Sequence, residues 1–458
     1  MNISTLLTAG SRTAPAAGRV YLPGDPGYDT ARQGFNVSVD QRPAAVGYPE
    51  TATEVADAVR VAVEHGLRVA VWTTGHNPGP LGDLRDTLLL RTDRMRTVQV
   101  DPTARRVRAA AGARWDDVVA AVAPHGLSVL HGSSPTVGVT GYSLGGGIGW
   151  YARALGLAAH RITAAQLVLA DGTLVRTSDS EHPALIWALR GGGASVGIVT
   201  ELEFEAFGFD TAYAGRLAWD LSQARKVLPV WAGWAAHAPR EVTTSFRLLA
   251  LPPLPTIPAE LRGRRLVMID GAVLGGDPDA ERILAPLRAL HPEVDTFTRT
   301  PTPALTRLHL DPEEAVPVVT DSLMLHGLPT DAVEAFLAAA GPESASSLLL
   351  AEIRQLGGAL ADPHPERAAL SRLSGRFLLF AAGLAVDDAA AAAVERDVAR
   401  VVAAVQPWGT GRTYLNFVER PSDTATAFTA QAWARLQRLR ATYDPRGVLH
   451  TPHTAWPR

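Results

Sequence analysis

The chain has 458 residues, of which 47% are hydrophobic and 19% charged, and its formal net charge is −3. This size and composition allow a large core in two domains or in one domain with an inserted lobe, and the near-balanced charge argues against binding to nucleic acid or to an anionic membrane surface. Cysteine is absent, which excludes disulfides, iron–sulfur clusters and thiolate zinc sites. Because no apolar run of membrane-spanning length and no signal-peptide pattern occurs, we expect a cytoplasmic protein.

Residues 43–77 have the pattern of a strand, a helix and a second strand. Thr51 and Glu54 form a capping box at the start of the helix, and Gly66 stands at its end. The second strand leads directly into the loop Thr73-Thr74-Gly75-His76. A βαβ unit therefore places a histidine just beyond the end of a strand.

Further strands and helices are predicted up to about residue 207. Short strands follow in TLLLRT, TVQV and VRAAAG, and a helix spans about residues 115–123. Beyond residue 150, the pattern predicts a hairpin that turns at Asp171-Gly172, a helix in HPALIWALRGGG and a strand in VGIVTELEFEAF. These elements belong to one lobe.

The second half of the chain predicts an α+β lobe, in which helices cover one face of an antiparallel sheet. Its strands lie in VTTSFRLLAL, RRLVMIDGAVLG, LLLAEIRQLGG and FLLFAAGL. Its helices include residues 331–340, capped by Thr330, and residues 387–405, which carry a stripe of valines. LPPLPTIP reads as a surface loop. The chain ends with a predicted strand in TYLNFVE and a helix that stops at Asp444-Pro445.

Residues 131–150, HGSSPTVGVTGYSLGGGIGW, contain too many glycines for a regular element, since each glycine in a helix or strand costs roughly 0.5–1 kcal/mol relative to alanine. Gly141-Tyr142-Ser143-Leu144-Gly145 matches the G-x-S-x-G of hydrolases, and residues 147–152 match G-x-G-x-x-A of dinucleotide-binding folds, but neither has the required flanking strand. A third interpretation takes this stretch and TTGHNPGP as two loops that clamp a pyrophosphate. Simple tight turns are the alternative.

The two loops and the chain around them resemble one family. SPTVGVTGYSLGGGIG resembles C-P-T-V-G-V-G-G-H-x-x-G-G-G-x-G of FAD-linked oxidases of the berberine-bridge-enzyme type, in the vanillyl-alcohol-oxidase/p-cresol-methylhydroxylase superfamily. TGHN resembles the family's G-G-H loop, and WALRGGGASVGIVTELEFE its W-A-x-R-G-G-G-x-N-F-G-I-V-T segment. YLNF and RLRATYDPRGVLHTPH resemble its C-terminal motifs. The likeness runs in order from Pro43 to His453.

This resemblance implies an FAD cofactor held by one covalent link. His76 matches the histidine that bonds to the flavin 8α-methyl group, whereas Ser134 stands where the family has the cysteine of a second link. A serine cannot form that thioether. Val137 falls where a small side chain admits dioxygen, which favours an oxidase over a dehydrogenase. The resemblance places FAD against Thr73, Thr74, Gly75, His76, Asn77, Ser133, Ser134, Thr136, Val137, Gly138, Gly141, Tyr142, Gly146, Gly149, Gly197, Ile198, Val199, Tyr414 and Asn416.

The catalytic groups are less well defined, because Phe417 and Ile148 occupy positions where family members often carry tyrosines. Neither side chain can take a proton. The catalytic candidates are Tyr142, Tyr414, Glu352 and Arg354. Strand alternation puts Glu352 and Arg354 on one face, either as substrate contacts or as an ion pair that supports the sheet. A neutral amine substrate would need no protein base.

We therefore expect a two-lobed FAD-dependent oxidase of a small alcohol or amine that passes hydride to flavin N5 and returns electrons to dioxygen. Residues 1–207 and 408–458 would form the flavin domain, and 208–407 an inserted substrate domain. A flavin-dependent oxidative cyclase, a dehydrogenase, a flavoprotein without turnover and a hydrolase that uses Ser143 are the alternatives. His450 and His453 have no carboxylate at a matching spacing, so we expect no metal site.

Overall fold

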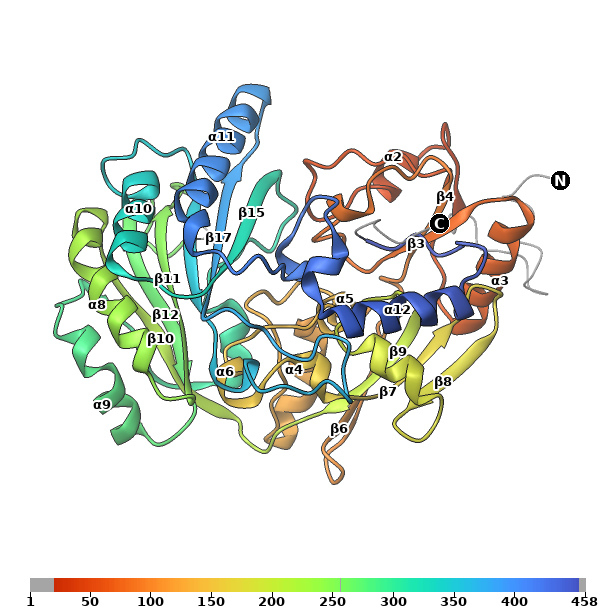
Figure 1. Cartoon of the computed structure of the whole chain (residues 1–458), viewed down its shortest axis with the longest axis horizontal. Coiled ribbons are helices and arrows are strands. Elements are labelled where there is room, and N and C mark those ends of the chain that lie inside the picture. The colour runs from red at the N-terminus through yellow and green to blue at the C-terminus, as the bar shows by residue number, and fades with distance from the viewer. Residues whose placement is uncertain (1–19, 256, 453–458) are drawn as a thin grey trace.

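Three β-sheets organise the molecule, two in one lobe and one in the other (Figure 1). The computed structural model describes residues 20–255 and 257–452. Residues 1–19 and 453–458 of the expected flavin domain, with His453, lie outside the described residues. Within the described ranges, no helix is both long and apolar enough to cross a membrane.

The first sheet contains the predicted βαβ unit. Its strand order is β1 (Val20–Tyr21), β2 (Ala45–Gly47), β4 (Thr87–Arg91), β3 (Arg68–Trp72), and β4 pairs in parallel with both β2 and β3. Helix α3 (Ala52–Glu64) packs Val55, Val59 and Ala62 against the sheet. Thr51 caps this helix by accepting from Glu54 N at 3.2 Å, as predicted, but the Glu54 carboxylate accepts from Glu50 N and not from Thr51 N as a capping box requires. The short α2 (Tyr28–Ala31) lies before β2.

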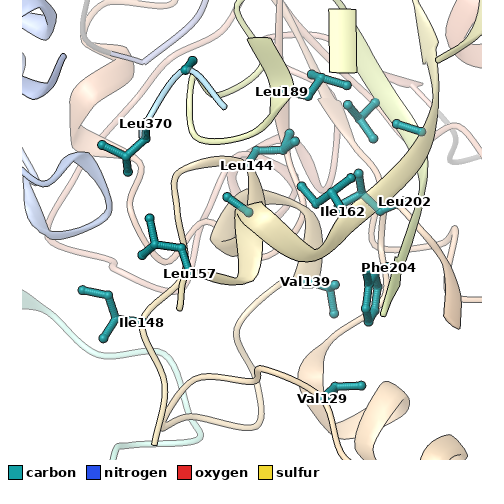
Figure 2. Close-up of a cluster of buried hydrophobic side chains, with 14 of the residues drawn as sticks. Val129, Val139, Leu144, Ile148, Leu157, Ile162, Leu189, Leu202, Phe204 and Leu370 are labelled. Carbon is teal, nitrogen blue, oxygen red and sulfur yellow. The ribbon is translucent and has the colours of Figure 1, made fainter. Parts of the chain in front are cut away.

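The second sheet is antiparallel and forms the centre of the same lobe. Its order is β5 (Val98–Asp101), β6 (Arg106–Ala110), β9 (Ile198–Glu205), β7 (Ile162–Val168), β8 (Leu174–Ser178). The predicted hairpin and the strand β9 are confirmed. The main core of the lobe joins this sheet to α4 (Trp115–Val122), α5 (Val139–Leu144), α6 (Ala152–Leu155) and α7 (Pro183–Leu189). Figure 2 shows Val139 and Leu144 of α5 within this cluster, together with Leu202 and Phe204 of β9.

The third sheet has eight strands and confirms the predicted antiparallel architecture. Its path is β13 (Val294–Asp295), β10 (Thr211–Asp220), β12 (Arg265–Val273), β11 (Val242–Ala250), β16 (Leu350–Gln355), β17 (Phe377–Leu384), β15 (Val318–Leu325), and β14 (Thr298–Pro301) also pairs with β10. On one face it packs against α8 (Ala224–His237), α9 (Asp277–Arg288), α10 (Thr330–Ala340) and α11 (Asp388–Val405). The predicted valine stripe of α11 is buried there.

The C-terminal segment returns to the first lobe. Helix α12 (Ala430–Tyr443) ends before Asp444, and His450 N then donates to Val69 O of β3 at 2.8 Å. The His450 ring is buried between Thr87 Oγ1 (2.9 Å) and Leu81 O (2.7 Å). The segment around Leu449 therefore lies beside β3 of the first sheet.

Three local predictions are wrong. TYLNFVE is not a strand, because residues 415–417 form a 3₁₀ turn. Thr330 is the first residue of α10 and its side chain makes no cap, since Pro329 occupies the capping position. Part of the glycine stretch is regular after all, because Val139–Leu144 forms α5, whose buried Val139 and Leu144 compensate for the glycine inside it.

Candidate functional site

The loop after β3 presents a row of free backbone N–H groups. Among residues 20–255 and 257–452, the N–H groups of residues 74–77 have no hydrogen-bond acceptor. Two carbonyl groups of the same loop are occupied, since Thr74 O and Gly75 O accept from Phe35 N and Asn36 N at 3.0 and 3.2 Å. Gly75 has a φ of +67°, and a Cβ there would lie 2.6 Å from Gly34 Cα. Consecutive free N–H groups make a concavity that suits a diphosphate.

The imidazole of His76 is held at both edges and on one face. Its Nδ1 lies 2.8 Å from Thr74 Oγ1, and its Nε2 lies 3.2 Å from Thr136 Oγ1. The ring stacks on Phe35, with centroids 3.8 Å apart and planes inclined by 10°. Burial lowers the pKa of His76 to about 3. The imidazole is therefore neutral near pH 7 and keeps a nitrogen lone pair, as bond formation to carbon requires.

The first part of the glycine stretch packs against this loop. Thr136 reaches His76, and Ser134 Oγ lies 3.2 Å from Thr136 Oγ1. A Cβ on Gly138 would lie 2.8 Å from Thr73 Cβ, so the two loops are in close contact. Gly141 is different, because it is exposed and a Cβ there would have nothing within 4 Å. The structure thus brings the two predicted loops together and leaves open space at Gly141.

The later glycines of the stretch are explained by contacts within the protein. A Cβ on Gly146 would lie 2.9 Å from the Tyr414 ring, and one on Gly147 would lie 2.5 Å from the Tyr142 ring. A Cβ on Gly149 would lie 1.9 Å from His131 O. Close packing of protein groups therefore accounts for these glycines without a cofactor, although Gly146 and Gly149 were predicted to contact one.

Tyr142 and Tyr414 lie on either side of this glycine segment. The Tyr414 hydroxyl accepts from Gly147 N at 2.8 Å, and Asn416 Nδ2 donates to Tyr142 O at the same distance. The Tyr142 hydroxyl is buried and has no hydrogen-bond partner among the described residues. Burial raises the pKa of both tyrosines above the ordinary value. Both phenols are therefore protonated at neutral pH and can donate a hydrogen bond but are poor bases.

A buried charged network covers the inner face of the third sheet. The strand register puts Arg247 opposite Glu352, and Ser245 between Asp270 and Arg354. Arg354 Nε donates to Glu352 Oε1 at 2.6 Å, which confirms that these two side chains share a face. His309 joins the network, with Nδ1 2.9 Å from Asp270 Oδ2 and Nε2 3.1 Å from Arg354 Nη2. Arg247 also pairs with Asp270.

The network keeps both carboxyl groups ionised. Burial alone would raise the pKa of Glu352, but the charges of Arg354 and His309 outweigh burial and lower it to about 2. Arg247 and His309 likewise lower the pKa of Asp270 against the effect of burial. Burial and Arg247 disfavour the charged form of His309, yet the carboxylates of Asp270 and Glu352 raise its pKa above the ordinary value. Removing one member of such a buried pair is strongly destabilising, because it leaves the other charge buried without a partner.

The network borders a small hollow that is partly open to solvent. One wall comes from the glycine stretch and includes Ile148, which is 4% exposed. The opposite wall comes from β11 and β16 and includes Arg354. The guanidinium of Arg354 lies 5.1 Å from the centre of the Phe417 ring. The hollow thus joins the two lobes at the predicted site.

Other predicted residues lie apart or are closed off. Ile198 and Val199 at the start of β9 are each 3% exposed and pack in the hydrophobic core. Gly197 packs on Leu167, which a Cβ would meet at 2.6 Å. Val137 is partly buried against the core. Ser143 is 3% exposed within α5, so it is not the exposed serine of a nucleophile elbow.

Sequence reasoning missed several residues of this region. They are Phe35, which stacks on His76, and the network members Arg247, Asp270 and His309. Charged residues inside predicted buried strands were the available signal for Arg247 and Asp270, because an ionised group inside a sheet needs a partner. Neither Phe35 nor His309 belongs to a recognisable pattern.

Comparison with known proteins gives a family and several relatives. Residues 43–178 match the FAD binding domain family. The chain is 35% identical over 190 residues to (R)-6-hydroxynicotine oxidase of Paenarthrobacter nicotinovorans, a match that covers 42% of each chain. It is 33% identical over 268 residues to glucooligosaccharide oxidase of Sarocladium strictum, which covers 57% of this chain and 51% of the relative. These matches span about half the length of the relatives.

Solved structures share the fold over the whole chain. The BBE-like 1 protein of Physcomitrella patens superposes with a TM-score of 0.85 at 21% identity and covers 100% of this chain and 99% of its own. Glucooligosaccharide oxidase of Acremonium strictum, whose FAD is described as 6-S-cysteinyl, 8α-N1-histidyl, superposes with a TM-score of 0.83 at 23% identity, with coverage of 100% and 99%. Residues 43–178 therefore match an FAD binding domain, and the chain as a whole shares the fold of these solved structures.

Proposed function

We propose that the protein is an FAD-dependent oxidase of a small molecule, with the cofactor held by the loops 73–77 and 133–141. The observation that carries this proposal is the row of free N–H groups at residues 74–77 beside a neutral, held His76. In this assignment, residues 1–207 and 408–458 form the flavin domain and 208–407 the substrate domain. The relatives named above oxidise 6-hydroxynicotine and glucooligosaccharides by name, which supports an alcohol or an amine as the substrate.

The covalent link would run through His76 only. Ser134 stands beside Thr136 in the second loop, and its hydroxyl cannot supply the cysteinyl bond described for glucooligosaccharide oxidase. Because the chain has no cysteine, no other residue can replace it. One link leaves the flavin less oxidising than two would.

Bound FAD would supply the hydride acceptor, and the residues of this chain would orient the substrate and manage its protons. Tyr142 and Tyr414 are protonated and serve as hydrogen-bond donors rather than bases. Glu352 is ionised but fully buried, so it acts by holding Arg354 at the wall of the hollow. With Ile148 and Phe417 at the positions of the family tyrosines, an amine that reacts in its neutral form suits this site better than an alcohol.

Flavin retention on the denatured polypeptide tests the covalent link. We expect purified protein to be yellow, and acid precipitation should leave the colour in the pellet. In His76→Ala, the colour should move to the supernatant, whereas Ser134→Ala should retain it in the pellet. Release of the flavin from wild-type protein would show that His76 forms no bond, and a colourless wild-type protein would refute the FAD proposal itself.

Reoxidation tests the assignment as an oxidase. The flavin would be reduced without oxygen and then mixed with aerated buffer, and rapid return of the oxidised spectrum with peroxide formation is expected. Slow reoxidation would instead identify a dehydrogenase and count against Val137 as a residue that admits dioxygen.

A further inference from the structure

The hollow between the lobes carries one charged group on its wall, and that group is a cation. We propose that this hollow selects substrates that bear a carboxylate, and that Arg354 is the residue that binds it. The inference rests on the proposed function, since it names the substrate class of the same site. It uses the chemistry of the hollow, which is independent of the flavin.

Arg354 alone is charged among the described residues that line the hollow. The remaining lining consists of hydroxyl, amide, apolar and glycine residues: Ser133, Ile148, Gly149, Trp150, Thr243, Thr244, Ser245 and Gln355. A wall that exposes a single guanidinium and no carboxylate favours a ligand with an anionic group. A planar guanidinium binds a carboxylate through charge-assisted hydrogen bonds, which are the strongest that side chains form.

The guanidinium is already oriented by the protein. Its Nε donates to Glu352 Oε1 at 2.6 Å, and its Nη2 lies 3.1 Å from His309 Nε2. One face lies over Phe417. Nη1 has no acceptor among the residues that the structure describes, and the side chain is 16% exposed. Arg354 lines the hollow with Nη1 as its free donor, and because the side chain is already held, binding a ligand costs little side-chain entropy.

The hydroxyl groups on the wall complement this edge. Ser133 Oγ donates to Asp311 Oδ2, Ser245 Oγ to Asp270 Oδ1, and Thr244 Oγ1 to Gln355 Oε1. Since each of these protons is used inside the protein, the oxygens can only accept from a ligand. They suit an amine or hydroxyl hydrogen on the substrate and cannot bind its carboxylate. Thr243 Oγ1 accepts from Arg153 N and keeps its own proton, and Arg354 is the charged donor for the anionic end.

Arg354 is paired with Glu352 within a network of mixed charges. Arg247 and Arg354 balance Asp270 and Glu352, and His309 adds positive charge as it protonates. The carboxylates of Asp270 and Glu352 raise the pKa of His309 above its ordinary value, against the effects of burial and Arg247. Asp311 lies farther along the same loop and is engaged by Ser133. With Asp311 included, three carboxylates face two arginines and His309, so the attraction for an anion rests on the position of the Arg354 guanidinium and not on an excess of positive charge.

Binding of a matched pair of probes tests the proposal without turnover. Phenylacetate and phenylacetamide have nearly the same shape but differ in charge, and calorimetry measures both dissociation constants on the purified holoprotein. We expect wild-type protein to prefer phenylacetate by about tenfold or more, the scale of one charge-assisted hydrogen-bonded pair. Arg354→Gln should remove this preference, and Arg354→Lys should retain part of it.

For Glu352→Gln we expect the opposite change in the preference for phenylacetate over phenylacetamide. It removes the carboxylate that neutralises Arg354 but keeps a side chain that can accept from Nε, so the preference for phenylacetate should increase. If Arg354→Gln and Glu352→Gln both weaken the preference, disruption of the sheet explains the result and the proposal fails. It also fails if wild-type protein binds neither probe or binds both equally.

Failure of this inference and failure of the proposed function give different results. A colourless protein that still prefers phenylacetate would refute FAD binding and support the assignment of the hollow. A yellow protein with a covalent flavin but without this preference would support FAD binding and refute the assignment of the hollow.

Discussion

The orientation of the His76 ring depends on Phe35, a residue that lies outside every motif of the sequence. Phe35 stacks on the imidazole at 3.8 Å, while Thr74 and Thr136 hold its two nitrogens. A ring held on one face and at both edges has few orientations open to it, and a reaction with a neighbouring carbon depends steeply on such orientation. Phe35 is therefore a positioning residue for the predicted covalent link.

We expect Phe35→Leu to bind FAD but to attach only a small fraction of it covalently, because leucine fills the space without stacking on the imidazole. Phe35→Tyr should retain attachment, since it keeps the aromatic face. The measurement is the ratio of flavin in the acid pellet to flavin in the supernatant. Full attachment in Phe35→Leu would show that the two threonines are sufficient.

The sequence identified residues best where a motif coincides with a local turn. Thr73 to Asn77 and Ser133 to Gly138 were predicted as two loops, and they do meet. His309 could not be predicted, because its partners Asp270 and Arg354 come from different strands. Which of the predicted residues touch FAD stays a prediction.

At the level of elements, α5 shows how tertiary contacts override glycine content. Its buried Val139 and Leu144 pack in the core, and the helix survives with Gly141 in its interior. The strands β10 and β15 were missed in turn, since alanine and glycine in β10 and the Asp-Ser pair in β15 are poor strand formers. Pairing with neighbouring strands of the third sheet outweighs the low strand propensity of both segments. Tertiary contacts also decide against the predicted strand TYLNFVE. The Asn416 side chain donates to Tyr142 O, and residues 415–417 form a 3₁₀ turn instead of pairing with a neighbouring strand.

Two glycine-to-alanine changes distinguish glycines that allow close packing within the protein from glycines that leave open space. Gly147 has a φ of +77°, and a Cβ there would meet the Tyr142 ring at 2.5 Å and Ala158 at 2.7 Å, so Gly147→Ala should destabilise the fold by about 2–4 kcal/mol. Gly141→Ala should stabilise α5 by up to about 1 kcal/mol, because it sits in a helix with open space around it. If Gly141 faces FAD, this variant should also bind less flavin. Denaturant unfolding and flavin content measure these effects, and equal stability of the two variants would contradict them.

At the scale of the whole molecule, one buried junction ties the lobes together. Asn36 Nδ2 donates to Glu419 Oε2 at 3.0 Å and to Val318 O of β15 at 3.1 Å, while its Oδ1 accepts from Val318 N at 3.2 Å. Asn36 also follows Phe35 and donates its own N–H to Gly75 O. The third sheet, the C-terminal segment and the loop that carries His76 therefore meet at Asn36.

Glu419 makes this junction sensitive to pH. Burial raises the pKa of Glu419 from its ordinary value of 4.5 to about 7, although the hydrogen bond from Asn36 acts in the opposite direction. Between pH 4.5 and 7 the folded state binds this proton more tightly than the unfolded state does. The free energy of unfolding must therefore fall as the pH rises through that window, and the loss is complete above about pH 7.

Glu419→Gln should remove this dependence, because an amide stays neutral and its oxygen can still accept from Asn36. At pH 8 we expect the variant to be more stable than wild type by up to about 3 kcal/mol, since one pKa unit corresponds to about 1.4 kcal/mol. The difference should shrink as the pH falls and approach zero below pH 4.5, where the Glu419 carboxyl becomes protonated in both states. Denaturant unfolding across this pH range measures it, with the exposed Glu395→Gln as a control for the loss of one negative charge. A stability gain that is the same at every pH, or that Glu395→Gln reproduces, would show that the Glu419 carboxyl is not the buried proton-binding group of this junction.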